Sequence, residues 1–524
     1  MISLISQGYK KSIFNAYQHL KLVDNWFVDL LALSLIIFFS AIIYLYNAIR
    51  FSLPLGFAGL YTLMAQVLAK NNYLLPATVP FYGPGGIPLA YPPLALYLMA
   101  FATQSFHLAA FEYLRFAPVI FSILSLIPLT LFFRIFLRSR VQSVIAIVII
   151  ILSPEIYLLQ VTSGGVVRAV GFLLANSSLL FAYLALQKMK WKYAAIAAFL
   201  LGLTVLTHLS YALFAFLSIG VLFLVEFRTF QYLKCTIAIF CGGFFVALPW
   251  LLTIISYYGF HVVTSAFNSH GNAEMFWTTY SAVKIPRFLV YIALTFSSAP
   301  VLGGLAISGF ILTILQKKWF PFIWFVTVMI SITECGRYLM VIASVLASIF
   351  IYEIASVILA FMRDWIYGKV IIILALTCIL LFGFAIQAKT ILGYSPAISD
   401  ATFELGEWFQ SRTKSDARYL FLMPAEENAE WLPYLLKRTP VVGHWGAEWL
   451  GTYNLQRNIL AEFNRCYQEQ SFDCITSVMD SNRIMPEYLI IPEQFTRSMI
   501  VQSLQDSPGW DLAYTNSDYQ VWQR

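Results

Sequence analysis

The segment 50–112 carries two turn sequences, Gly83-Pro84-Gly85-Gly86 and Tyr91-Pro92-Pro93-Leu94. The segment begins at Arg50 and ends at Glu112, and Lys70 is the only charged residue between them. Proline suits the first turn of a helix, because its missing N–H would have no partner there. The second turn therefore predicts that a helix begins at Leu94. The segment lies between the first two long apolar runs of the chain.

The composition indicates a membrane protein. Of the 524 residues, 60% are hydrophobic and 11% are charged, whereas soluble domains carry roughly a quarter charged residues. The apolar runs reach about 20 residues, which is enough to cross a hydrocarbon core of about 30 Å. The net charge of +7 does not indicate nucleic-acid binding, because the basic residues sit mostly in short connections between these runs. The first run is too long for a signal peptide, so we expect a retained span.

Basic clusters occupy every second connection, as the positive-inside rule predicts for cytoplasmic loops. This alternation predicts about eleven transmembrane helices, a cytoplasmic N-terminus and an extracytoplasmic C-terminus. The predicted spans are about 26–47, 113–134, 141–158, 168–187, 193–208, 209–226, 235–257, 287–315, 319–333, 338–361 and 370–390.

The apolar run 94–111 does not fit this alternation as a span, because a crossing there would turn the basic cluster at 134–140 outward. We therefore expect it to form a helix along the outer membrane surface, and 58–69 to form a second one. Both lie in a first outer loop, 48–112.

Residues 395–524 contain most of the Asp and Glu and no run that could span a membrane. We expect an extracytoplasmic α/β domain there, with its own core, after a transmembrane domain at 1–394. Its predicted helices are 401–412, 428–437, 454–468, 472–480 and 496–505; its predicted strands are 418–423, 440–443, 487–491 and a hairpin at 510–523.

Two of the six cysteines, Cys466 and Cys474, fall in this domain. In an oxidising compartment they form a disulfide, and the alternative is two free buried thiols. Cys235, Cys241 and Cys378 lie in predicted spans, where cysteine acts as a small apolar residue. No Cys/His spacing resembles a zinc site.

The chain resembles the GT-C superfamily of polytopic glycosyltransferases, which includes protein O-mannosyltransferases and aminoarabinose transferases. The resemblance is best over 26–210 and rests on Leu60-Tyr61, Tyr91-Pro92-Pro93-Leu94, the basic turn 134–140 and Ser153-Pro154-Glu155. It implies transfer of a sugar from a polyprenyl-phosphate donor to an acceptor on the outer face of the membrane. The sugar and the acceptor stay open.

The chain departs from the family at its acids. Family enzymes carry an acidic pair just before the tyrosine of the first loop helix, where this chain has Phe57 and Ala58. Because a carboxylate is the usual base for an attacking hydroxyl, the base has to come from elsewhere. Glu155, at the outer end of the third span, is the predicted catalytic residue. The alternative is an interfacial Glu155 that is solvated or paired with Arg168.

Six further residues are candidates for binding substrate or phosphate. Arginine binds phosphate with a bidentate fork, which makes Arg168 and Arg337 candidates; the alternatives are snorkelling for Arg168 and an internal pair with Glu334 for Arg337. His208 either binds phosphate or is a satisfied interfacial histidine. The candidates in the first outer loop are Tyr61, Tyr82 and Tyr91. Tyr61 is part of the Leu60-Tyr61 pair on which the resemblance rests. Aromatic residues of this loop either stack on a sugar or anchor the loop at the membrane interface.

Three functions follow from these features. The first is a membrane glycosyltransferase of the cell envelope that uses a polyprenyl-phosphate sugar, with no cofactor and no supported metal site. The second is a non-catalytic relative that binds lipid or polysaccharide or scaffolds envelope enzymes, which the missing acid favours. The third is a transporter, although no paired repeats or interrupted half-spans are found. A bacterial inner membrane is the simplest setting.

Overall fold

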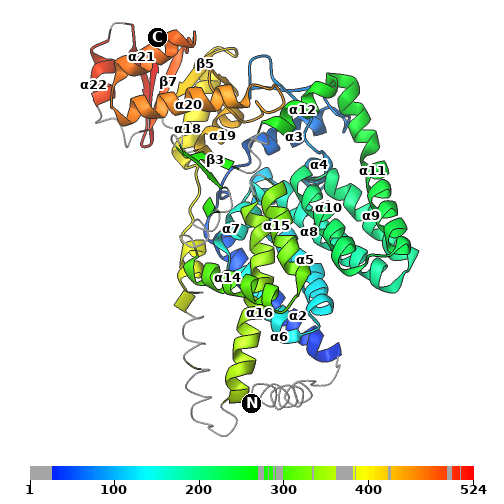
Figure 1. Cartoon of the computed structure of the whole chain (residues 1–524). Helices are drawn as coiled ribbons and strands as arrows, with labels where there is room; N and C mark the ends of the chain where they lie inside the picture. Colours follow the sequence, from blue (N-terminus) through cyan, green and yellow to red (C-terminus); the bar gives the residue numbers. More distant parts are fainter. Residues whose placement is uncertain are drawn as a thin grey trace.

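Apolar helices form a bundle, and a mixed α/β layer lies at one end of it (Figure 1). The structure is a computed structural model that describes residues 26–269, 277–280, 283–286, 289–290, 299–332, 335–361, 374, 382–383, 385–422, 426–492, 499–507 and 509–524. The long and short bundle helices are α2 (Trp26–Arg50), α5 (Ala110–Leu137), α6 (Arg140–Ile151), α8 (Gly165–Lys188), α9 (Trp191–Val205), α10 (Leu209–Glu226), α11 (Phe230–Tyr258), α14 (Pro300–Leu315), α15 (Trp319–Ser331) and α16 (Gly336–Phe361).

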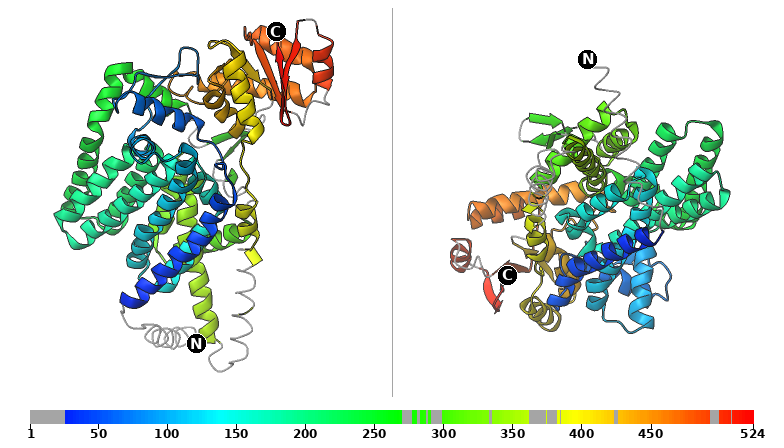
Figure 2. Two further views of the ribbon diagram at one scale, coloured as in Figure 1. Left: turned by 180° about the vertical axis from the view of Figure 1, so that it is seen from behind. Right: turned by 90° about the horizontal axis from the view of Figure 1, so that it is seen from below.

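Six helices of the described chain are long and apolar enough to cross a membrane, and a seventh span results if one bent helix pair is counted as a crossing. The protein is therefore a multi-pass integral membrane protein, as predicted. The helix α2 lies along the edge of the bundle (Figure 2), where large apolar side chains such as Trp26, Phe38 and Ile42 are exposed as lipid contact requires.

The total of about eleven spans and the orientation of both termini stay predictions. Most of the predicted span 370–390, and the start of 287–315, lie outside the described residues. The described helices α9, α14 and α15 coincide with predicted spans but have only 15, 16 and 13 residues. Between α11 and α14 the structure has the helix α12 (Phe260–Asn268) and a hairpin of β3 (Trp277–Tyr280) and β4 (Val283–Pro286).

The third predicted span, 141–158, is broken by a bend in the structure. After α6 the chain breaks and continues as α7 (Pro154–Ile156) and the π-helical turn η1 (Tyr157–Val161), bent by 57° from α6. Proline has no N–H and disfavours a helical residue before it, so Ser153 is extended and its hydroxyl caps the new turn. The break places Glu155 in the first turn of a new helix.

Both helices predicted in the first outer loop are found. They are α3 (Gly59–Lys70) and α4 (Leu94–Ser105), and the hairpin of β1 (Thr78–Val79) and β2 (Ile87–Pro88) lies between them. With 12 residues, α4 is about 18 Å long, too short to cross a membrane. The helix α3 packs against α4 and against the C-terminal layer, so protein covers most of its surface.

The C-terminal layer contains the predicted helices and strands within a few residues. Its sheet has the order β6-β5-β7-β9-β8, in which β5 pairs in parallel with β6 and β7 while β9 and β8 are antiparallel. The elements are α18 (Asp400–Arg412), β5 (Arg418–Phe421), α19 (Glu426–Leu436), β6 (Thr439–Pro440), α20 (Tyr453–Gln468), α21 (Phe472–Ser481), β7 (Tyr488–Pro492), α22 (Met499–Gln505), β8 (Asp511–Thr515) and β9 (Tyr519–Gln523).

Each face of this sheet has its own apolar cluster. On one face, α18 and α19 pack residues such as Leu405 and Leu432 against Tyr419. On the other face, α20, α21 and α22 contribute a second cluster that includes Phe463 and Ile475. The connections that follow β5 and β6 therefore run to opposite faces of the sheet.

Cys466 of α20 and Cys474 of α21 form a disulfide, which decides between the two alternatives left open by the sequence. Among the described cysteines, Cys235 and Cys335 are buried thiols and Cys241 is an exposed one. Cys378 lies outside the described residues.

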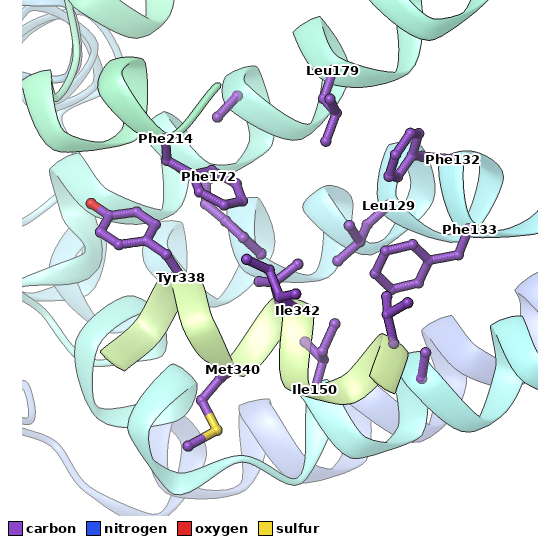
Figure 3. Packing of buried hydrophobic residues seen from close by; sticks show 14 of the residues in the cluster. Leu129, Phe132, Phe133, Ile150, Phe172, Leu179, Phe214, Tyr338, Met340 and Ile342 are labelled. Carbon is purple, nitrogen blue, oxygen red and sulfur yellow. The ribbon is translucent and has the colours of Figure 1, made fainter. Parts of the chain in front are cut away.

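The bundle core gathers apolar side chains from helices far apart in the sequence. Figure 3 shows Phe133 of α5, Ile150 of α6 and Ile342 of α16 turned toward one another, and all three are buried. This packing holds α16 against α5 and α6.

Candidate functional site

Two arginines and a histidine predicted as phosphate ligands lie in one neighbourhood. Arg168 is in the first turn of α8, Arg337 follows the first residue of α16, and His208 caps α10. The His208 ring lies 5.1 Å from that of Tyr211, and the Arg337 guanidinium carbon lies 5.5 Å from the same tyrosine ring. Three helices distant in the sequence thus bring these side chains together.

His208 lies close to both arginines. Both Arg337 and Arg168 lie within electrostatic reach of His208. Two guanidinium groups in one neighbourhood bring positive charge together, which favours an anionic ligand.

Arg168 has hydrogen-bonding capacity to spare. Its guanidinium carbon lies 4.9 Å from the Phe57 ring centre, while its buried Nε and Nη1 have no hydrogen-bond partner in the described chain. An arginine that stacks on an aromatic face keeps its N–H fork free at the edge, which is the geometry that phosphate oxygens accept. Arg337 is 4% exposed and lies over Tyr338 at 5.0 Å.

Glu155 packs against the N-terminus of α16. A Cβ atom at residue 336 would overlap the Glu155 carboxylate, so Gly336 is what allows this approach. The carboxylate also lies within electrostatic reach of Arg337, and a helix N-terminus favours a negative charge. The structure therefore brings Glu155 to Arg337, and not to Arg168, which was the pairing that the sequence left open.

Tyr61 and Tyr91 join the cluster from the outer loop. Their hydroxyl oxygens are 3.4 Å apart, and the Tyr91 ring makes edge contacts with His208 at 6.5 Å and Trp449 at 6.3 Å. Burial raises the pKa of Tyr91 well above its usual value, against the opposing effect of Arg168 and Arg337. Both hydroxyls are therefore protonated donors at neutral pH.

Tyr82 lies apart from this group. It is 4% exposed, and its hydroxyl donates a hydrogen bond of 2.7 Å to the backbone carbonyl of Glu430 in α19. The structure thus places the Tyr82 ring between the outer loop and the C-terminal layer.

Glu448 is not among the site residues predicted from the sequence. Glu448 lies in the turn before α20 and acts on Tyr61, whose pKa it raises. Burial raises the pKa of Glu448 itself to about 7, although its own N–H and that of Gly446 donate to the carboxylate. The signal in the sequence was the segment Glu448-Trp449-Leu450-Gly451, but nothing local links it to residue 61.

The missing acid of the first outer loop has a counterpart in α19. The Glu430 carboxylate accepts hydrogen bonds from the backbone N–H groups of Leu60 at 2.6 Å and Gly59 at 2.8 Å, at the N-terminus of α3. Trp431 beside it donates its indole N–H to the Gly56 carbonyl at 2.8 Å. An acid of the C-terminal layer therefore lies beside Phe57 and Ala58, where the resemblance implied an acidic pair.

This contact should make the protein's stability depend on pH. Burial raises the pKa of Glu430 from 4.5 to about 7, so between these values the folded chain binds more protons than the unfolded chain. The contribution of Glu430 to stability is therefore fully present below about pH 4.5 and is lost as the pH rises to about 7. We expect the melting temperature of the detergent-purified protein to fall over this range. In Glu430→Gln combined with Glu448→Gln the decline should be much smaller, and an unchanged decline would contradict the assignment.

No group of three or more metal-ligating side chains is found among the described residues.

The arrangement of the helices can be compared with known proteins. No protein-family model matches the sequence, and no curated protein matches it. Among solved structures, the oligosaccharyltransferase of Archaeoglobus fulgidus is 12% identical and superposes with a TM-score of 0.63 over 89% of this chain and 70% of that one. ArnT from Cupriavidus metallidurans, bound to undecaprenyl phosphate, is 13% identical, with a TM-score of 0.56 over 93% and 97%. The chain has the fold of the GT-C membrane glycosyltransferases.

The GT-C fold also relates this chain to the mycobacterial arabinofuranosyltransferase AftD, which is 12% identical with a TM-score of 0.50 over 94% of this chain and 39% of that one. The predicted GT-C-like fold of a polytopic helical membrane protein is thereby confirmed. Six predicted site residues lie where the first outer loop, the break between α6 and α7 and the C-terminal layer meet: Glu155, Arg168, Arg337, His208, Tyr61 and Tyr91. Their individual roles stay predictions.

Proposed function

We propose that the protein is a membrane glycosyltransferase that takes a sugar from a polyprenyl-phosphate donor and transfers it to an acceptor at the outer face of the membrane. The observation that carries the proposal is Arg168, whose buried Nε and Nη1 lack partners in the described chain beside a second guanidinium, Arg337. Two arginines in a partly buried site favour an anion with several acceptor oxygens, such as a phosphate.

In this proposal the arginines bind the donor's phosphate and stabilise it as it leaves. The bond between the anomeric carbon and the phosphate oxygen breaks, and the electron pair stays on the phosphate of the lipid. The acceptor's attacking oxygen forms the new bond and gives its proton to Glu155, which acts as general base. Tyr61 and Tyr91 are placed to donate hydrogen bonds to the sugar or the phosphate.

Lipid phosphates in proteins of the same fold support the choice of donor. The Archaeoglobus fulgidus oligosaccharyltransferase has been solved with an inhibitory peptide and a dolichol-phosphate, and ArnT with undecaprenyl phosphate. Both are membrane glycosyltransferases that hold a polyprenyl-type phosphate, which is the donor class that the two arginines favour in this chain.

The second candidate is a non-catalytic GT-C relative that binds lipid or polysaccharide. The acid-free outer loop favours it. Glu430 and Glu448 weaken that argument, because they bring two carboxylates from the C-terminal layer to α3 and Tyr61.

The experiment that separates the two is sugar transfer by the purified protein in lipid nanodiscs, with a panel of radiolabelled polyprenyl-phosphate hexoses and pentoses. An enzyme releases polyprenyl phosphate and labels an acceptor glycan, lipid or protein from its own envelope fraction. If no donor of the panel is turned over while polyprenyl phosphate still binds, the non-catalytic function replaces the proposal.

Replacing Arg168 by Met should weaken donor binding about 10- to 100-fold, because charged hydrogen bonds contribute about 1.5–3 kcal/mol each. Arg168→Lys should lie between Met and the wild type, since it keeps the charge and loses the fork. Donor affinity is measured from the KM for the donor and from binding of the lipid phosphate alone. Lys70→Met, which removes an exposed charge from the first outer loop, should change neither value; equal losses in both variants would refute a specific contact.

A further inference from the structure

A pocket lies in the C-terminal layer, outside the cluster of arginines. It encloses about 140 Å³ between β5, β6, α19 and α20. By the same measure one water needs about 10–15 Å³, so the space suits a ligand of about ten heavy atoms, which is the size of a hexose ring.

The pocket occupies the place where the sheet topology predicts a ligand site. The chain leaves the carboxyl end of β5 for α19 on one face and the carboxyl end of β6 for α20 on the other. In sheets with parallel strands, ligands bind in the crevice where neighbouring connections diverge in this way. Phe421, at the end of β5, and Gly443, just after β6, both line the pocket.

Two buried hydrogen-bond donors of the pocket have no partner in the described chain. They are the hydroxyl of Tyr419, a residue 1% exposed, and the indole N–H of Trp445. Leaving a buried donor unpaired costs about 1–3 kcal/mol. A ligand with acceptor oxygens would pair both donors and remove this cost, which favours such a ligand in the pocket.

The other walls give the pocket a mixed aromatic and polar character. Tyr82 closes it from the outer loop, and α20 contributes Asn464 and Arg457. Flat aromatic faces beside hydrogen-bonding groups suit a ring whose faces carry C–H groups and whose edge carries hydroxyls. That is the chemistry of a sugar.

Trp445 connects this pocket to the site of the arginines. Its ring centre lies 4.9 Å from that of Phe57, and Phe57 lies under the Arg168 guanidinium at 4.9 Å. We propose that the pocket binds a hexose-type unit of the acceptor glycan and thereby presents the acceptor to the donor site. This inference rests on the proposed function, because only a transferase has an acceptor. Sugar binding to the pocket can nevertheless be measured without sugar transfer.

The test uses the full-length protein in nanodiscs and saturation-transfer NMR with methyl hexopyranosides and methyl hexopyranosiduronates. We expect at least one of these probes to bind, and Tyr419→Phe to weaken its binding about 3- to 10-fold. Because the Tyr419 hydroxyl has no partner in the described chain, Tyr419→Phe should be at least as stable as the wild type. If Tyr419 had only a structural role, the variant would bind the sugar as well as the wild type does. Tyr488→Phe is the matched control, since Tyr488 pairs with Tyr419 across the sheet and is not in the pocket lining.

Absence of saturation transfer with every probe overturns the inference, as does equal binding by wild type and Tyr419→Phe. Preferential binding of a peptide in place of the sugars also overturns it. If sugars bind but no donor is turned over, the pocket stands and the proposed transfer fails. If transfer occurs without any sugar binding in this pocket, the function stands and the pocket proposal fails.

Discussion

Glu155→Gln should lower the rate of sugar transfer by about 10²- to 10⁴-fold, the range that a positioned general base contributes. Glutamine keeps the shape and the contact with Gly336 but cannot take the acceptor's proton. Donor binding should change much less than the rate, because in the proposed mechanism the phosphate is held by Arg168 and Arg337. The measurement is the initial rate of transfer in nanodiscs at saturating donor.

The matched control is Glu112→Gln. Glu112 lies in the first turn of α5, where its carboxylate pairs with Arg115 at 2.9 Å and its side chain is 46% exposed, so the variant should keep nearly full activity. If Glu155→Gln remains within a few-fold of the wild type and Glu448→Gln loses transfer, the base is Glu448, whose pKa of about 7 suits that task. That result would contradict the assignment of Glu155 as the general base.

Glu430→Ala should loosen the C-terminal layer from the outer loop. The substitution removes the acceptor of the Gly59 and Leu60 N–H groups and leaves both donors buried, at a cost of about 2–6 kcal/mol. Glu430→Gln should be milder, because its amide oxygen still accepts a hydrogen bond from these donors. We expect a lower melting temperature and faster tryptic digestion of the C-terminal layer.

Glu407→Ala provides the comparison, because Glu407 is an exposed glutamate on the neighbouring helix α18. Its melting temperature and digestion rate should match those of the wild type. If Glu430→Ala digests no faster than Glu407→Ala, the carboxylate does not hold the two parts together. Transfer should fall with Glu430→Ala as well, since α3 carries Tyr61.

Much of the fold could be predicted because its signals are local. The proline pair before Leu94 predicted the start of α4, and the positive-inside alternation excluded a span at 94–111; the structure has a 12-residue helix there. The C-terminal helices and strands follow from periodicity and turn residues. The break at Pro154 was missed because an apolar run on both sides outweighed a single proline.

The candidate site could be predicted only in part. Arg168, Arg337 and His208 are conspicuous because polar residues at membrane depth are costly, and the structure brings them together. Glu448 and Glu430 carry no such mark: both belong to a polar segment where glutamate is ordinary. Their relevance comes from contacts that span the chain, such as Glu430 with Leu60, which local sequence patterns do not encode.

The position of a bound lipid phosphate tests the proposed donor site most directly. A cryo-EM structure of the protein in nanodiscs with added undecaprenyl phosphate should show the phosphate group within hydrogen-bond distance of the Arg168 Nε and Nη1, next to Arg337 and His208. A phosphate bound elsewhere on the bundle, with the Arg168 guanidinium still stacked on Phe57 and unliganded, would contradict the proposed donor site.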